Sequence, residues 1–124
     1  MIDRINQAIM RLIRRRSGVE VGSLHTDSEQ IVLRGKHGSL WTARWSDISR
    51  VVAVRETGFI GESILLFVQA TDGLQLLNDD QEGFVQAAAA MARALPGAID
   101  PRDWMLRLSA NPPGARITVF EAPT

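Results

Sequence analysis

The residues best suited to proton transfer or metal binding are two histidines, and neither stands in a recognisable constellation. His25 has Asp27 two residues later, and His37 lies in a stretch that reads as a turn. A structural metal site needs three or four converging ligands, whereas His25 and Asp27 supply two at most. No Gly-x-Ser-x-Gly motif marks a nucleophilic serine, and the absence of cysteine excludes disulfides and thiolate ligands. We therefore expect no enzymatic activity, no metal and no cofactor.

Two further polar stretches have structural explanations. The acidic run at residues 79–82 stands at the head of an expected helix, where Asp79 and Glu82 have the spacing of a capping box. Residues 57–62 contain glycines but lack the Lys-Ser/Thr pair of a phosphate-binding loop, and they join two expected strands. Phe59 and Ile60 at the tip of this loop are apolar where polar residues are usual. They are candidate partner contacts, and packing against the core is the alternative.

The charge of the chain is balanced overall but unevenly distributed. There are 14 basic and 14 acidic residues, yet residues 1–16 hold five arginines and one aspartate, which leaves the remaining chain mildly acidic. We call residues 1–16 the basic arm. Nucleic-acid-binding domains carry a more extensive basic surface, so we expect no nucleic-acid partner.

The basic arm carries apolar residues at spacings of three and four, a pattern that predicts an amphipathic helix ending near Ser17-Gly18. Such a helix packs on its own domain, pairs with another protein, or lies on an anionic membrane. The first two interpretations are favoured because its apolar side has no Trp or Phe to anchor in a membrane interface. Its candidate partner contacts are Arg11, Arg14, Arg15 and Arg16.

Short stretches rich in Val, Ile, Leu and Trp follow the arm, separated by turn residues about every ten positions. In the third stretch Trp41, Ala43 and Trp45 share one face, as the two-residue period of a strand requires. Asp72-Gly73 predicts a type I′ hairpin, and the unbroken apolar run at 64–68 predicts a strand buried on both faces. The pattern indicates an antiparallel meander with strands near 19–25, 30–34, 39–45, 49–56, 63–71 and 74–78.

The last third of the chain changes to a helical pattern. Apolar residues at helical spacing predict a long helix over 80–95, ended by Pro96-Gly97. Asp100-Pro101 predicts the start of a short helix over 101–109, and 116–121 reads as a final strand. No linker, repeat or low-complexity tract interrupts the pattern, so we expect one domain over 1–124.

No apolar stretch approaches the ~20 residues needed to span a bilayer, and the N-terminus lacks the apolar run of a secretory signal. We therefore expect a cytoplasmic location.

The order of six short antiparallel strands and a long helix resembles the pleckstrin-homology-like architecture. The stretch 41–48, continued by Val52-Ala53, Leu95-Pro96-Gly97 and Trp104, is also similar to a group of small uncharacterised bacterial proteins, and the resemblance covers residues 30–121. It implies an α+β fold with a six- to seven-stranded antiparallel sheet, or a partly open barrel, closed by the long helix. It does not imply binding of lipid headgroups, because phosphoinositide-binding members carry basic residues at the first hairpin, where this chain has Thr26-Asp27-Ser28-Glu29.

These observations favour a non-catalytic protein-interaction module, in which an exposed sheet edge, the 57–62 loop or the basic arm binds a partner. An immunity-like protein that neutralises a bacterial toxin is one case within this class. The alternatives are peripheral membrane association through the basic arm and small-ligand binding between helix and sheet. The sequence does not identify the protein partner, and it is compatible with a homo-oligomer.

Overall fold

The computed structural model describes residues 22–58 and 61–123. The expected helix of the basic arm and the loop tip Phe59-Ile60 lie outside the described residues. In chain order the elements are β1 (Ser23–Thr26), β2 (Gln30–Gly35), β3 (Gly38–Arg44), the 3-10 helix η1 (Trp45–Asp47), β4 (Ile48–Gly58), β5 (Gly61–Ala70), β6 (Gly73–Asn78), α2 (Phe84–Ala94), α3 (Pro101–Ser109) and β7 (Arg116–Glu121).

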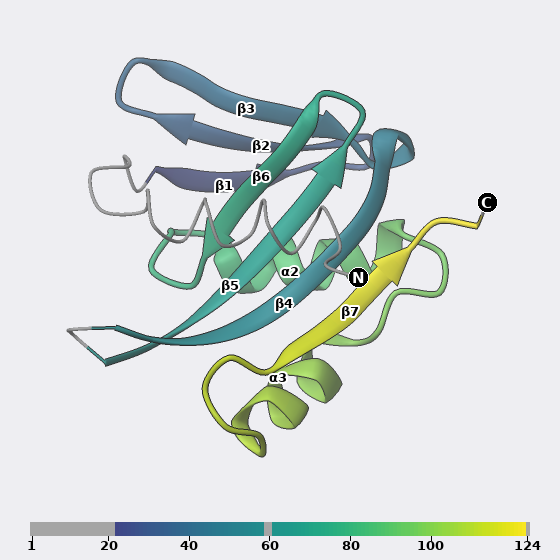
Figure 1. The fold of residues 1–124 in the computed structure, drawn as a ribbon. Helices are drawn as coiled ribbons and strands as arrows, with labels where there is room; N and C mark the ends of the chain where they lie inside the picture. The colour runs from purple at the N-terminus through teal and green to yellow at the C-terminus, as the bar shows by residue number, and fades with distance from the viewer. Residues whose placement is uncertain (1–21, 59–60, 124) are drawn as a thin grey trace.

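The fold is α+β with antiparallel strands, as expected, but the described strands form two sheets and not one. The first sheet has the order β1-β2-β3 and the second has the order β6-β5-β4-β7 (Figure 1). The chain passes between them through η1, where the buried Trp45 donates its Nε1–H to the backbone oxygen of Asp27 over 2.9 Å. Strands β3 and β4, on either side of η1, belong to different sheets, and the described strands do not form a closed barrel.

Helices α2 and α3 cover one face of the second sheet (Figure 1). One large apolar cluster joins both helices to strands of both sheets, and Trp104 of α3 and Met91 of α2 are almost completely buried within it. Burial of large side chains of this kind stabilises a fold by about 1.5–3 kcal/mol each. This cluster therefore holds the two sheets and the helices together as one packed body.

The two central strands of the second sheet are buried on both faces, as the unbroken apolar run predicts. Leu66 and Val68 of β5 belong to the large cluster beside the helices. Leu65 and Phe67, which point the other way, belong to a separate buried cluster on the opposite face. We call this opposite side the second face, and its buried members are Val52, Val54, Leu65, Phe67 and Leu76.

Helix α2 begins at Phe84 and not near residue 80, so the expected capping box of Asp79 and Glu82 does not form. The N-cap is Gly83, with a φ of 85° and no side-chain cap. The preceding segment instead pairs with the first sheet, since Leu24 N donates to Glu82 O over 2.7 Å. The segment before α2 is therefore held by a hydrogen bond to a distant strand and not by the expected capping box.

The hairpin between β5 and β6 lies where Asp72-Gly73 predicts it, but its turn differs. Ala70 pairs with Gly73, so Thr71 and Asp72 are the loop residues. No described residue other than glycine has a positive φ, whereas a type I′ turn needs positive φ at both central positions. The expected type I′ turn is therefore wrong.

The short helix and the final strand occupy the ranges expected. Asp100 caps α3 by accepting a hydrogen bond from Arg102 N over 2.9 Å, with Pro101 in the first turn. Strand β7 pairs with β4 as the edge of the second sheet, and Val119 packs into the large cluster.

Candidate functional site

The structure places His25 and Asp27 in separate hydrogen bonds. His25 Nε2 lies 2.9 Å from Ser23 Oγ on the same strand. Asp27 Oδ1 accepts hydrogen bonds from the backbone N–H groups of Glu29 and Gln30, at 2.8 and 2.9 Å, and so closes the turn between β1 and β2. Within residues 22–58 and 61–123, no group of three or more His, Asp or Glu side chains could hold a metal ion.

The most open feature of the described fold is the outer edge of β3, which we call the β3 edge (Gly38–Arg44). β3 is the last strand of the first sheet, with β2 on one side and no described strand on the other (Figure 1). Five of its seven residues are exposed. An unpaired strand of this kind presents a row of backbone donors and acceptors that another chain can bind.

The other edge strands are better protected. Backbone hydrogen bonds cover parts of β1 and β7, from Leu24 N to Glu82 O and from Ile99 N to Val119 O over 2.9 Å. Strand β6 has an unpaired edge as well, but only Gly73 of its six residues is exposed. Among the edges that the structure describes, the β3 edge is the one most open to an added strand.

The side chains of β3 alternate as the sequence predicts. Ala43 is buried and Trp41 packs against the large cluster, whereas Leu40, Thr42 and Arg44 are exposed on the opposite face. Leu40 is 49% exposed. Natural edge strands are commonly blocked by charges or proline, yet β3 has no proline and a single charge, Arg44 at its end.

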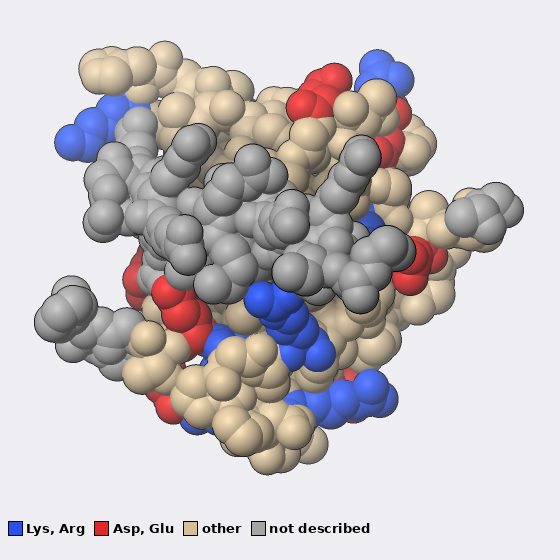
Figure 2. All heavy atoms as spheres, viewed as in Figure 1, with Lys and Arg blue, Asp and Glu red and all other residues tan. Residues whose placement is uncertain are grey.

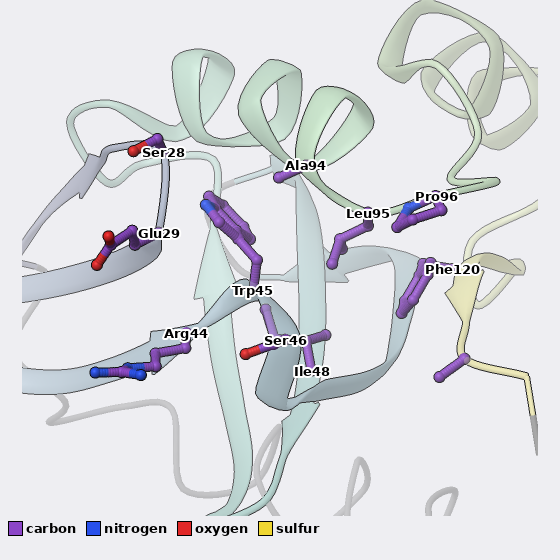
Figure 3. A pocket seen from close by; sticks show the side chains of 11 residues that line it. Ser28, Glu29, Arg44, Trp45, Ser46, Ile48, Ala94, Leu95, Pro96 and Phe120 are labelled. Atoms are coloured by element: carbon purple, nitrogen blue, oxygen red, sulfur yellow. The ribbon is translucent and has the colours of Figure 1, made fainter.

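A groove of about 660 Å³ begins where β3 ends. We call it the corner groove. The charged ends of Glu29 and Arg44 lie at one side of it, Pro96 and Phe120 lie at the other, and Trp45 stands between them (Figure 3). Its lining residues are Ser28, Glu29, Arg44, Trp45, Ser46, Ile48, Ala94, Leu95, Pro96, Phe120 and Ala122.

The corner groove combines apolar and polar lining residues. Its apolar floor is formed by side chains that the core already holds, including Trp45, Leu95 and Phe120. The groove also has hydrogen-bond donors and acceptors, supplied by one carboxylate, one guanidinium and the serine hydroxyls. Such a surface suits a polypeptide segment with mixed polar and apolar side chains.

A second cavity, of about 210 Å³, lies near the stem of the β4–β5 hairpin. Its cation, Arg55, forms an ion pair with Glu62 and donates to the backbone oxygen of Asn111. Because Arg55 already bonds to both of these groups, we assign this cavity a structural role in connecting the hairpin to the loop before β7.

Comparison with known proteins gives no identification. No protein-family model, no curated protein and no solved structure matches this chain. Function must therefore be argued from the surface itself.

The residues that the sequence singled out as contacts are not part of this surface as described. Phe59, Ile60 and the arginines of the basic arm lie outside the described residues. The corner groove escaped sequence reasoning because its lining comes from four separate stretches of chain. A sheet edge was among the expected contact sites, but which strand forms the open edge depends on strand order, which the sequence pattern does not encode.

Two further observations describe the charge and hydropathy of the described part of the chain. On the face in Figure 2, the coloured residues show acidic and basic side chains interspersed. None of the helices in the described part of the chain is long and apolar enough to cross a membrane.

Proposed function

We propose that this protein is a non-catalytic interaction module that binds an extended segment of a partner protein along the β3 edge. The observation that carries the proposal is the exposure of this seven-residue edge strand, with Leu40 49% exposed on it. Backbone hydrogen bonds from an added strand supply affinity, and side-chain contacts on the outer face of the sheet supply specificity.

The corner groove supports the same proposal because Arg44 belongs both to the β3 edge and to the lining of the groove. A segment that runs along β3 therefore meets the groove at the end of the strand. Glu29 and Arg44 would pair with polar groups of the segment there, and the apolar side beside Phe120 would receive one of its apolar side chains. We prefer an extended polypeptide segment to a small ligand because the segment would contact both the β3 edge and the corner groove.

The pleckstrin-homology-like assignment and an immunity-like role are parts of this proposal. Among the described residues, seven antiparallel strands in two sheets with helices on one side support the first as an architecture. The second is one case of a module that binds a protein partner through the β3 edge.

The proposal is tested by site-directed photo-crosslinking in cells of the native host. A photoreactive amino acid replaces Thr42, which is exposed on β3, in the full-length chain. The matched control carries it at Leu106 of α3, which is 72% exposed and lies away from the first sheet. We expect one protein to crosslink from position 42 and not from position 106.

Affinity for the crosslinked partner then separates edge binding from simple proximity. Leu40→Lys should weaken binding by about tenfold or more, since a lysine on an edge strand opposes pairing and the leucine contact is lost. Leu106→Lys makes the same change on α3 and should leave the affinity unchanged. Equal crosslinking from both positions, or no effect of Leu40→Lys, would contradict binding at the β3 edge.

A further inference from the structure

The first sheet has a charge of its own, which bears on what the β3 edge binds. Beyond the basic arm the chain is mildly acidic, yet residues 30–44, which form β2, β3 and the hairpin between them, contain no Asp or Glu. The same residues contain three cations, namely Arg34, Lys36 and Arg44. Charge of one sign on a binding surface selects partners that carry the opposite sign.

Two of these cations lie around the turn between β2 and β3. We call residues 34–39 the hairpin end of the β3 edge. In Figure 1 it lies at the end of the first sheet opposite to the passage from β3 into β4. Arg34, the last but one residue of β2, and Lys36, in the turn, are both exposed.

The pairing of the strands places Arg34 on the outer face of the first sheet, which also carries Leu40. Arg34 is paired with Ser23 of β1 and with Ser39 of β3, and paired residues share a face. The ion pairs among the described residues use arginines of β4 and α3. The guanidinium of Arg34 is therefore available to a partner.

A β-bulge gives Arg34 access to the open edge. Leu33 pairs with Trp41 and Arg34 pairs with Ser39, so Leu40 is the extra residue of β3. The side chain between Arg34 and the open edge is thus a small serine. An added strand would lie about 10 Å from β2, at two strand spacings, and an arginine facing a glutamate can bridge that gap.

The same bulge changes how a bound segment is recognised along β3. A bulge interrupts the regular ladder of backbone hydrogen bonds, so pairing with an added strand is regular only over Trp41–Arg44. Beyond Leu40, side chains must supply the contacts. At the hairpin end those side chains are cationic.

We propose that the partner segment is acidic, and that one of its carboxylates pairs with Arg34 at the hairpin end. Lys36 in the adjoining turn adds to the positive potential there. This inference rests on the proposed function and deepens it, because it gives the segment an order. The segment is acidic at the hairpin end, apolar against Leu40, and mixed in polarity where it reaches the corner groove.

The same charges disfavour a second copy of this chain as the occupant. Two β3 strands paired antiparallel would place Arg44 of each copy beside Arg34 and Lys36 of the other. Like charges opposed across strands are destabilising. Glu29, which lines the corner groove, precedes β2 and so lies one strand further from the open edge. An acidic segment of another protein avoids this repulsion.

The test uses a displayed library of short random peptides, selected on the immobilised full-length chain. Each selected peptide is sorted by whether Leu40→Lys weakens its binding, which shows that the peptide occupies the β3 edge. Among these edge-binding peptides we expect Asp and Glu to be enriched over Lys and Arg.

Arg34→Glu then tests the ion pair with the edge-binding peptides. It replaces attraction by repulsion, so the affinity measured by calorimetry should fall by about tenfold or more. Arg102→Glu makes the same charge change on α3, where the side chain is 95% exposed, and should leave the affinity unchanged. A peptide whose acidic residue is changed to lysine should bind the Arg34→Glu chain more tightly than the natural chain. Misfolding of the variant would not produce this reciprocal gain.

The outcomes separate this inference from the proposed function. Edge-binding peptides that lack the acidic enrichment, or that bind the Arg34→Glu chain as tightly as the natural chain, would overturn the inference and leave the β3 edge as the binding site. Failure to select any peptide that Leu40→Lys weakens would count against the proposed function and the inference together. A dimer in sedimentation that Leu40→Lys dissociates would overturn the inference in favour of a second copy.

Discussion

At the scale of single residues, Gly83 and Gly97 show how the same backbone conformation can carry different constraints. Their φ angles are 85° and 84°, which L-residues with side chains rarely adopt. A β-carbon at Gly83 would overlap the backbone oxygen of Leu24, whereas one at Gly97 would meet no atom within 4 Å. Glycine at position 83 therefore allows both the positive φ and the close approach of β1 to the start of α2.

The pair gives a prediction in which one glycine is the control for the other. Gly97→Ala should lower the free energy of unfolding by about 1–2 kcal/mol, the cost of the left-handed conformation. Gly83→Ala should cost about 1–3 kcal/mol more, because β1 and α2 must also move apart. Urea denaturation of both variants measures the difference, and equal losses would mean that the contact with Leu24 imposes no constraint.

At the scale of elements, α3 shows how a short helix is fixed by its ends and by one buried side. Asp100 accepts the hydrogen bond from Arg102 N at its start, and Trp104 and Leu108 are each 1% exposed. Isolated helices of nine residues are marginal in water, so the packing of this buried side stabilises α3. The Asp100 cap also contributes to the stability of the helix and therefore of the whole protein.

Asp100→Ala should lower the free energy of unfolding by about 1 kcal/mol, the usual cost of losing an N-cap side chain. The control is Asp103→Ala, which removes an exposed ion pair with Arg107 in the same helix and should cost about 0.5 kcal/mol or less. Chemical denaturation followed by circular dichroism measures both. Equal losses would argue against a capping role for Asp100.

At the scale of the whole molecule, the large apolar cluster connects elements that are distant in sequence. Trp45, at the corner between the two sheets, and Trp104, in α3, belong to the same cluster. Small single domains with one core usually unfold in a single cooperative transition. The sheets and the helices should therefore lose their structure together.

This expectation can be measured with two single-tryptophan variants. Trp41→Phe with Trp104→Phe leaves Trp45 as the reporter, and Trp41→Phe with Trp45→Phe leaves Trp104. In each variant the urea midpoint from tryptophan fluorescence should coincide with the midpoint from far-ultraviolet circular dichroism. A lower fluorescence midpoint for Trp104 alone would show that α3 unfolds separately and would contradict one cooperative domain.

The sequence by itself determined the features that depend on near neighbours. Asp100-Pro101 marked the start of α3, alternation identified the inward residues of β3, and an unbroken apolar run identified the doubly buried strand β5. These patterns are readable because helix caps and strand faces depend on residues only a few positions apart.

Only the tertiary structure decided how these elements meet. At the corner between the two sheets Trp45 donates a hydrogen bond to Asp27, and just before the late start of α2 Leu24 pairs with Glu82. The β3 edge exists because β3 is the last strand in its sheet, and the corner groove combines four stretches of chain. Contacts between residues far apart in sequence fix such features, and no local pattern in a single chain encodes them.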